Sequence, residues 1–192
     1  MSDKKYQQTY RIPSTRYKSH AYDGGIYFVT ICTENKEHYF GTIDDDSTVV
    51  LSEIGQFMTE QISKTKDLRQ DIGAEIPVFV VMPNHVHLIV CIDGVAPIVH
   101  SPRRDALNAS PLNASHQENN ESANLFGPQR KNLASIIRGI KSSVTGFANK
   151  NDIKFAWQSR FHDRIVRDYH ELNRIADYIE NNPFNWKNDD YY

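Results

Sequence analysis

His85 and His87 are separated by one residue and lie in an otherwise apolar run, residues 85–92. Alternate side chains of a β-strand point to the same face, with Cβ atoms roughly 7 Å apart, so both imidazoles can converge on one metal ion. The alternative is a pair of histidines that face solvent or polar groups. Because unpaired imidazoles are costly to bury among apolar neighbours, the sequence favours the metal site.

Other enzyme classes also use closely spaced histidines, and their patterns do not fit here. Cupin sites place a glutamate a few residues after the pair, whereas Leu88 to Cys91 follow in this chain. Sites of the metallo-β-lactamase type need an Asp-His soon afterwards, and two-histidine phosphoesterases use His-x-Thr or His-x-Ser twice. Neither pattern occurs at or after this histidine pair in residues 85–94.

A second set of candidate residues is spaced i, i+4, i+8 near the C-terminus: Arg174, Tyr178 and Asn182. On a helix these side chains share one side. A tyrosine, whose pKa is ordinarily about 10, can act as a covalent nucleophile when a nearby cation or base assists it. Asn182 could offer an oxygen to a metal. Taken alone, the residues better fit a tyrosine at the edge of a core stripe and an asparagine that ends the helix before Pro183.

The chain has 192 residues and a formal net charge of -2, but the charges are segregated. Residues 1–20 hold five basic residues against one acidic residue, and residues 127–170 hold nine against three. This distribution indicates an anionic partner bound on one side. We expect a cytoplasmic protein, because the sequence shows neither a signal peptide nor a transmembrane run. Cys32 and Cys91 are predicted to be buried free thiols.

The elements that must position these residues follow from hydrophobic periodicity. Ser52 is the expected N-cap of a helix of about fifteen residues, and Pro83-Asn84 is the expected hairpin turn. Strands are predicted at 26–32, 77–82, 85–92 and 161–166, a short strand at 48–51, and further helices from about 133 to 144 and from 168–169 to Pro183. The order predicts an α+β fold, a ferredoxin-like split βαβ with an antiparallel sheet, helices on one face and an added C-terminal helix.

The domain prediction divides the chain into a basic N-terminal arm, one folded domain and a short tail. The arm is residues 1–20, the domain residues 21–186, and a short tail residues 187–192. Within the domain, residues 94–129 are rich in Asn, Ser, Pro and Ala and are predicted to be a long, mobile polar loop.

Four sequence blocks, in this order along the chain, resemble the HUH family of single-tyrosine transposases, specifically the REP-associated tyrosine transposases. The blocks are residues 27–33, 80–90, 157–163 and 177–183, and the resemblance runs from about Arg11 to Trp186. It implies that His85 and His87 bind Mg²⁺ or Mn²⁺, that Tyr178 is the nucleophile and that Asn182 completes the metal site. Tyr178 would attack a phosphodiester of single-stranded DNA, forming a 5′-phosphotyrosine and freeing a 3′-hydroxyl.

The resemblance also implies a single-stranded or hairpin DNA partner. The candidates for gripping it are Arg11, Arg16, Lys18, Arg138 and Lys141, while Tyr17 and Tyr22 could stack on bases. His162 and Arg174 are expected as accessory residues, although a structural contact suits His162 equally well. A homodimer and an association with the nucleoid are also compatible with this resemblance. Two alternatives stay open: a domesticated, non-catalytic DNA-hairpin binder, and a metal-dependent hydrolase in which Tyr178 is only structural.

Overall fold

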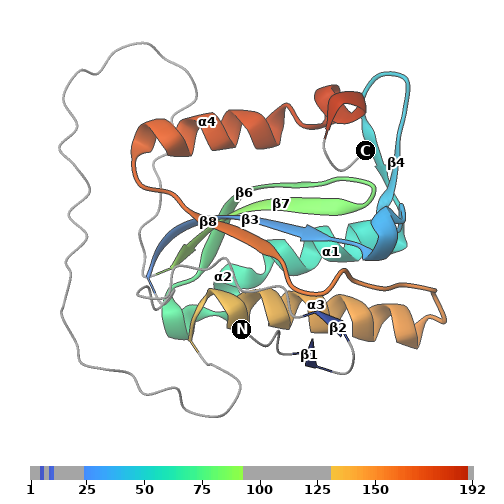
Figure 1. Cartoon of the computed structure of the whole chain (residues 1–192), viewed down its shortest axis with the longest axis horizontal. Helices are drawn as coiled ribbons and strands as arrows, with labels where there is room; N and C mark the ends of the chain where they lie inside the picture. The colour runs from blue at the N-terminus through green and yellow to red at the C-terminus, as the bar shows by residue number, and fades with distance from the viewer. Residues whose placement is uncertain (1–4, 7–8, 11–23, 93–130, 190–192) are drawn as a thin grey trace.

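A four-stranded antiparallel sheet forms the centre of the molecule. The computed structural model describes residues 5–6, 9–10, 24–92 and 131–189 (Figure 1). The sheet has the order β6-β7-β3-β8, and its strands are β3 (Gly25–Cys32), β6 (Glu75–Val81), β7 (His85–Ile92) and β8 (His162–Ile165). The first and third of these strands are therefore the central pair, as the ferredoxin-like prediction requires.

Side-chain alternation along β7 assigns each face of the sheet to a different core. Every residue of β7 is buried. Val86, Leu88 and Val90 belong to one hydrophobic cluster, whereas Ile89 and Cys91 belong to another. Because side chains two residues apart share a face, His85 and His87 lie on the face of Ile89 and Cys91.

Helices cover both faces of the sheet. The first cluster is completed by α1 (Glu53–Ser63) and α3 (Leu133–Lys150), which pack against one face. On the opposite face lies α4 (Tyr169–Glu180), whose Leu172, Ile175 and Ile179 complete the second cluster (Figure 1). The predicted α+β class is thus confirmed, with two main helices on one face and the added C-terminal helix on the other.

The helix predicted after Ser52 is shorter than expected. Ser52 does cap α1, accepting a hydrogen bond from the Gly55 backbone N–H, but α1 has eleven residues and is followed by the short α2 (Thr65–Leu68). The Ser63 and Thr65 hydroxyls donate to carbonyls one turn earlier, of Thr59 and Gln61. Such bonds weaken and bend a helix, which accounts for the break.

The other predicted elements lie close to their expected positions. The short strand is β5 (Val49–Leu51), paired with β4 (Gly41–Ile43), and β6 and β7 are joined through the Pro83-Asn84 turn. Three 3-10 helices add to these: η1 (Glu34–Lys36), η2 (Gln70–Ile72) and η3 (Pro183–Asn188). No helix in the described ranges is long and apolar enough to span a bilayer.

Parts of the predicted arm and loop fall outside the described residues. Two short strands of the arm, β1 (Lys5–Tyr6) and β2 (Thr9–Tyr10), pair with each other. Arg11, Arg16, Tyr17, Lys18 and Tyr22 lie outside the described residues, as does the loop at 94–129.

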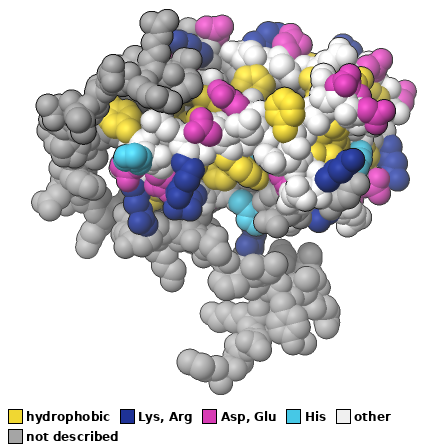
Figure 2. All heavy atoms as spheres, turned by 90° about the horizontal axis from the view of Figure 1, so that it is seen from above, with side chains coloured by type: hydrophobic (Ala, Val, Ile, Leu, Met, Phe, Trp, Pro, Cys, Tyr) yellow, Lys and Arg dark blue, Asp and Glu magenta, His cyan; other side chains and the backbone are white. Residues whose placement is uncertain are grey.

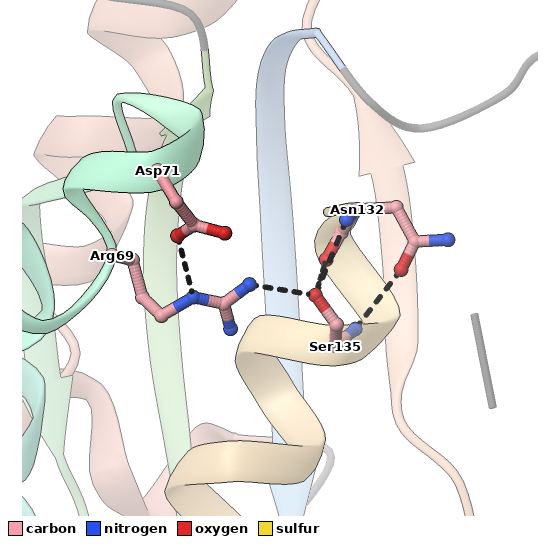
Figure 3. A network of polar contacts seen from close by, with 4 residues as sticks. All are labelled: Arg69, Asp71, Asn132 and Ser135. Carbon is pink, nitrogen blue, oxygen red and sulfur yellow. Dashed lines mark hydrogen bonds and ion pairs between the residues drawn. The ribbon is translucent and has the colours of Figure 1, made fainter. Parts of the chain in front are cut away.

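A polar network fixes the start of α3. Asn132 and Ser135 form a capping box, in which the Ser135 N–H donates to Asn132 Oδ1 at 3.0 Å. The Arg69 guanidinium donates to Ser135 Oγ at 2.9 Å and also pairs with Asp71 (Figure 3). These contacts tie the segment before β6 to the helix that covers the sheet.

Replacing Asn132 by alanine should lower the free energy of unfolding by about 1 kcal/mol, because the buried cap of α3 is lost. Asn149→Ala, at an exposed position within α3, is the matched control and should leave stability unchanged or slightly higher. Urea denaturation measures both. Equal midpoints for wild type and Asn132→Ala would show that the cap does not stabilise the helix.

Candidate active site

The two histidines of β7 lie side by side under the end of α4. Their ring centroids are 4.5 Å apart, and His85 and His87 are 0% and 1% exposed. Strand pairing places Cys32 opposite His85 and Thr30 opposite His87 on the neighbouring β3. The predicted convergence of the two imidazoles is therefore present in the structure.

Two side chains orient these rings, and neither was predicted from the sequence. Asn84 Oδ1 lies 2.9 Å from His85 Nδ1. An amide oxygen only accepts, so His85 Nδ1 carries the proton and Nε2 keeps its lone pair. The Thr30 hydroxyl lies 2.8 Å from His87 Nδ1. Both contacts resemble those that fix the orientation of metal-binding histidines.

Burial keeps both imidazoles neutral. It lowers the pKa of His85 to about 4, against an opposing effect from the nearby charge of Asp189. It lowers the pKa of His87 to about 2, and His85 adds to that effect. A neutral imidazole is the form that binds a metal, so both rings are ready to act as ligands at neutral pH.

Tyr178 comes from α4 and reaches the same site. Its hydroxyl lies 3.2 Å from His87 Nε2, and its ring meets Phe28 edge-on, with centroids 6.2 Å apart. The side chain is 44% exposed. Tyr178 therefore belongs neither to the core nor to the free surface, since its phenol faces the histidines while part of the ring stays open to solvent.

Asp189 is a member of the site that the sequence did not indicate. Its Oδ2 accepts from Asn182 Nδ2 at 2.6 Å and from the Tyr178 hydroxyl at 3.4 Å. One ligand atom each from His85, His87 and Asp189 lie within 4.8 Å of one another. This carboxylate comes from the segment expected to be a tail, and the buried Trp186, stacked on His85, holds the segment in place.

Asn182 lies inside the cluster, at the place that the resemblance implies and not as a mere end to the helix. It is 1% exposed, and its amide interacts with His85 and favours the protonated imidazole. Its Oδ1 is buried and makes no hydrogen bond of ordinary length and angle with the described residues. The site therefore has a second oxygen, besides Asp189, that could bind a cation.

The other predicted residues lie outside this cluster. His162 is exposed on β8, and Arg174 is exposed on α4, one turn before Tyr178. Arg138 is exposed on α3, which covers the opposite face of the sheet. Lys141 donates to the carbonyls of Gln158 and Arg160, at 2.8 and 3.0 Å. Their roles in DNA binding stay predictions.

The cysteines do not supply a nucleophile. Cys32 and Cys91 are buried and free, as expected. Burial raises the pKa of Cys32 to about 11 and that of Cys91 to about 12. Both thiols are protonated at neutral pH, and only a thiolate would be reactive.

Comparisons with known proteins support the fold. No family model matches the chain. A protein of uncharacterised function from Haemophilus influenzae is 29% identical over 188 residues, which is 97% of this chain and 93% of that protein. The solved structure of the REP-associated tyrosine transposase bound to a REP hairpin superposes with a TM-score of 0.53 and 21% identity, over 90% of this chain and 74% of the other. The chain has the fold of that transposase.

The low pKa values of the two histidines predict that the metal-free protein loses stability in mild acid. Below the usual histidine pKa of 6.5 the unfolded chain takes up protons that the folded chain does not. Stability present above that pH is therefore lost as the pH falls, by up to about 2 kcal/mol for each histidine between pH 7 and pH 5. Urea unfolding in the presence of a chelator measures the difference.

A double variant, His85→Asn with His87→Gln, should lose most of this pH dependence. His162→Gln is the control, because that histidine is exposed. If the double variant and the wild type lost equal stability between pH 7 and pH 5, the buried pair would not be its source.

Proposed function

We propose that this protein is an HUH single-tyrosine transposase of the REP-associated group, which cleaves and rejoins single-stranded DNA of hairpin-forming repeats through a 5′-phosphotyrosine. The observation that carries the proposal is the 3.2 Å approach of the Tyr178 hydroxyl to His87 Nε2, across 91 residues of sequence. A tyrosine held against a histidine pair on a sheet face is the arrangement this chemistry needs.

The residues present fit a divalent metal. Two neutral imidazoles and the Asp189 carboxylate lie within mutual reach, and Asn182 Oδ1 adds a second oxygen. Mixed nitrogen and oxygen donors suit Mn²⁺ better than Mg²⁺ on ligand grounds, although either could serve. When bound, the metal would polarise the scissile phosphate and offset negative charge that develops on it.

In the proposed reaction, the Tyr178 oxygen forms a bond to phosphorus as the bond to the 3′ oxygen breaks. The phenol gives up its proton and the departing 3′ oxygen gains one, so the strand ends in a free 3′-hydroxyl. The other strand end stays linked through its 5′-phosphate to Tyr178. This phosphotyrosine ester remains reactive, so the strand can be rejoined. Partial exposure of Tyr178 leaves a path for a DNA strand to reach it.

A single chain holds every residue of the proposed site. His85, His87, Tyr178, Asn182 and Asp189 meet without a second copy. The homodimer stays a prediction that this cluster of five residues neither requires nor tests. A cytoplasmic, nucleoid-associated location is proposed from the nature of the DNA substrate.

Tyr178→Phe should abolish a covalent adduct between the protein and end-labelled hairpin DNA in the presence of Mn²⁺, because the attacking oxygen is missing. The adduct is detected as a labelled band that survives denaturation. Tyr169→Phe, on the first turn of α4, is the matched control and should still form it.

The same assay separates the alternatives. Cleavage that persists in Tyr178→Phe without any adduct would indicate a water-using hydrolase. Tight binding of the hairpin by wild type, with neither cleavage nor adduct, would indicate a non-catalytic DNA-binding protein. Either outcome would reject the proposed reaction.

Thr30→Val should weaken Mn²⁺ binding by about 10- to 100-fold, because His87 loses the contact that orients its ring. Titration calorimetry measures the affinity. Thr42→Val, on the exposed side of β4, is the control with the same chemical change. Unchanged affinity in Thr30→Val would mean that the hydroxyl does not support a metal site.

A further inference from the structure

A hollow of about 450 Å³ lies at the start of α4, apart from the histidine cluster. Its lining is made of charged and polar side chains: Arg164, Arg167, Asp168, His170, Glu171 and Arg174. Figure 2 looks onto the α4 side of the molecule and shows Lys or Arg side chains gathered with a histidine toward one end. The lining residues, 164 to 174, fall between the sequence blocks 157–163 and 177–183 that resemble the transposase family.

The acidic residues of this hollow are already engaged. Asp168 caps α4 by accepting from the Glu171 N–H at 2.7 Å. Glu171 is 8% exposed, pairs with Arg164 and accepts from the Arg167 N–H at 2.9 Å. The positive charge available to a ligand therefore comes from Arg167 and Arg174, whose guanidinium groups have no acidic partner among the described residues.

The hollow lies in line with the proposed nucleophile. His170, Arg174 and Tyr178 are each four residues apart, so they follow one side of α4, and all three are exposed. Arg174 precedes Tyr178 by roughly 6 Å along the helix axis. On the adjacent stripe, Asp177 and Glu180 are exposed and would repel a phosphate. A polyanion that reaches Tyr178 is thus guided along the side that holds Arg174.

We propose that Arg167 and Arg174 bind one backbone phosphate of the DNA strand whose scissile linkage reaches Tyr178. This inference rests on the proposed function and adds to it a subsite for the strand. Guanidinium groups bind phosphate through two parallel hydrogen bonds. Among the described residues the lining holds three arginines and no Phe, Tyr or Trp ring on which a base would stack, so we assign the subsite to the backbone.

The test is binding of fluorescently labelled single-stranded hairpin DNA to the full chain, with a chelator present so that no cleavage occurs. The double variant Arg167→Gln with Arg174→Gln should bind roughly tenfold more weakly. The slope of log affinity against log salt should become shallower by about 0.7, the value for one phosphate contact on a single strand. Arg164 is left in place, because its loss would strand the buried Glu171 carboxylate.

Lys150→Gln with Lys154→Gln is the matched control. It removes the same charge at exposed positions at and just beyond the end of α3 (Figure 1), and it should change affinity less than twofold. Thermal melting of each variant checks that folding is kept.

A series of oligonucleotides, each with one neutral methylphosphonate linkage, locates the contact. Wild type should lose affinity at each linkage whose phosphate the protein contacts. At one of these linkages the arginine double variant should show no further loss, since effects on one contact are not additive. Inorganic phosphate at millimolar concentration should compete weakly with the DNA, because it can occupy this subsite but makes none of the strand's other contacts.

The outcomes separate this subsite from the proposed function. If wild type binds the hairpin and the double variant has the same affinity, salt slope and linkage profile, the subsite is wrong while DNA binding stands. If wild type binds no hairpin DNA, the proposed function fails and the subsite fails with it. If the lysine control weakens binding as much as the arginine variant, the effect is one of general charge and the subsite is again wrong.

Discussion

The alternation of side chains along β7 is the constraint on which the rest of the structure depends. Even-numbered residues of this strand face α1 and α3, and odd-numbered residues face α4. The two histidines are odd-numbered, so the residues that complete their site must come from α4 and the segment after it. A shift of register by one residue would move both imidazoles into the apolar core of the other face, away from Tyr178 and Asp189.

Burial of the two histidines sets the chemical state of the site. The same apolar surroundings that lower the pKa of His85 and His87 keep both rings neutral. Neutral rings with fixed Nδ1 contacts can offer Nε2 to a cation. Asp189 supplies a negative charge at the open side of the cluster, where Tyr178 is partly exposed. The arrangement combines a buried set of potential metal ligands with a partly exposed tyrosine beside it.

Much of the fold and part of the site could be predicted from the sequence. The apolar strand runs and the Ser52 cap indicated the antiparallel sheet and the helix that follows its first strands, and Pro183 indicated where the last helix ends. The histidine pair could be recognised by spacing, whereas Tyr178 depended on resemblance, since a tyrosine on the edge of a helix has no distinctive pattern. Asp189 could not be predicted, because its position depends on the path of η3 and on Trp186 packing against His85. Lys141 was predicted only as a DNA contact, and nothing in the sequence indicated that the carbonyls of Gln158 and Arg160 accept its hydrogen bonds.

The central claim is that the phenolic oxygen of Tyr178 forms a covalent bond to a 5′-phosphate of the DNA. Trypsin cleavage after Arg174 and Lys187 releases residues 175–187, a peptide in which Tyr178 is the single tyrosine. Mass spectrometry of the denatured protein–DNA adduct, after nuclease trimming, therefore identifies the attachment site directly. The account predicts a nucleotide 5′-phosphate on this peptide at Tyr178. A nucleotide on any other peptide, or strand cleavage with this peptide unmodified throughout the reaction, would contradict it.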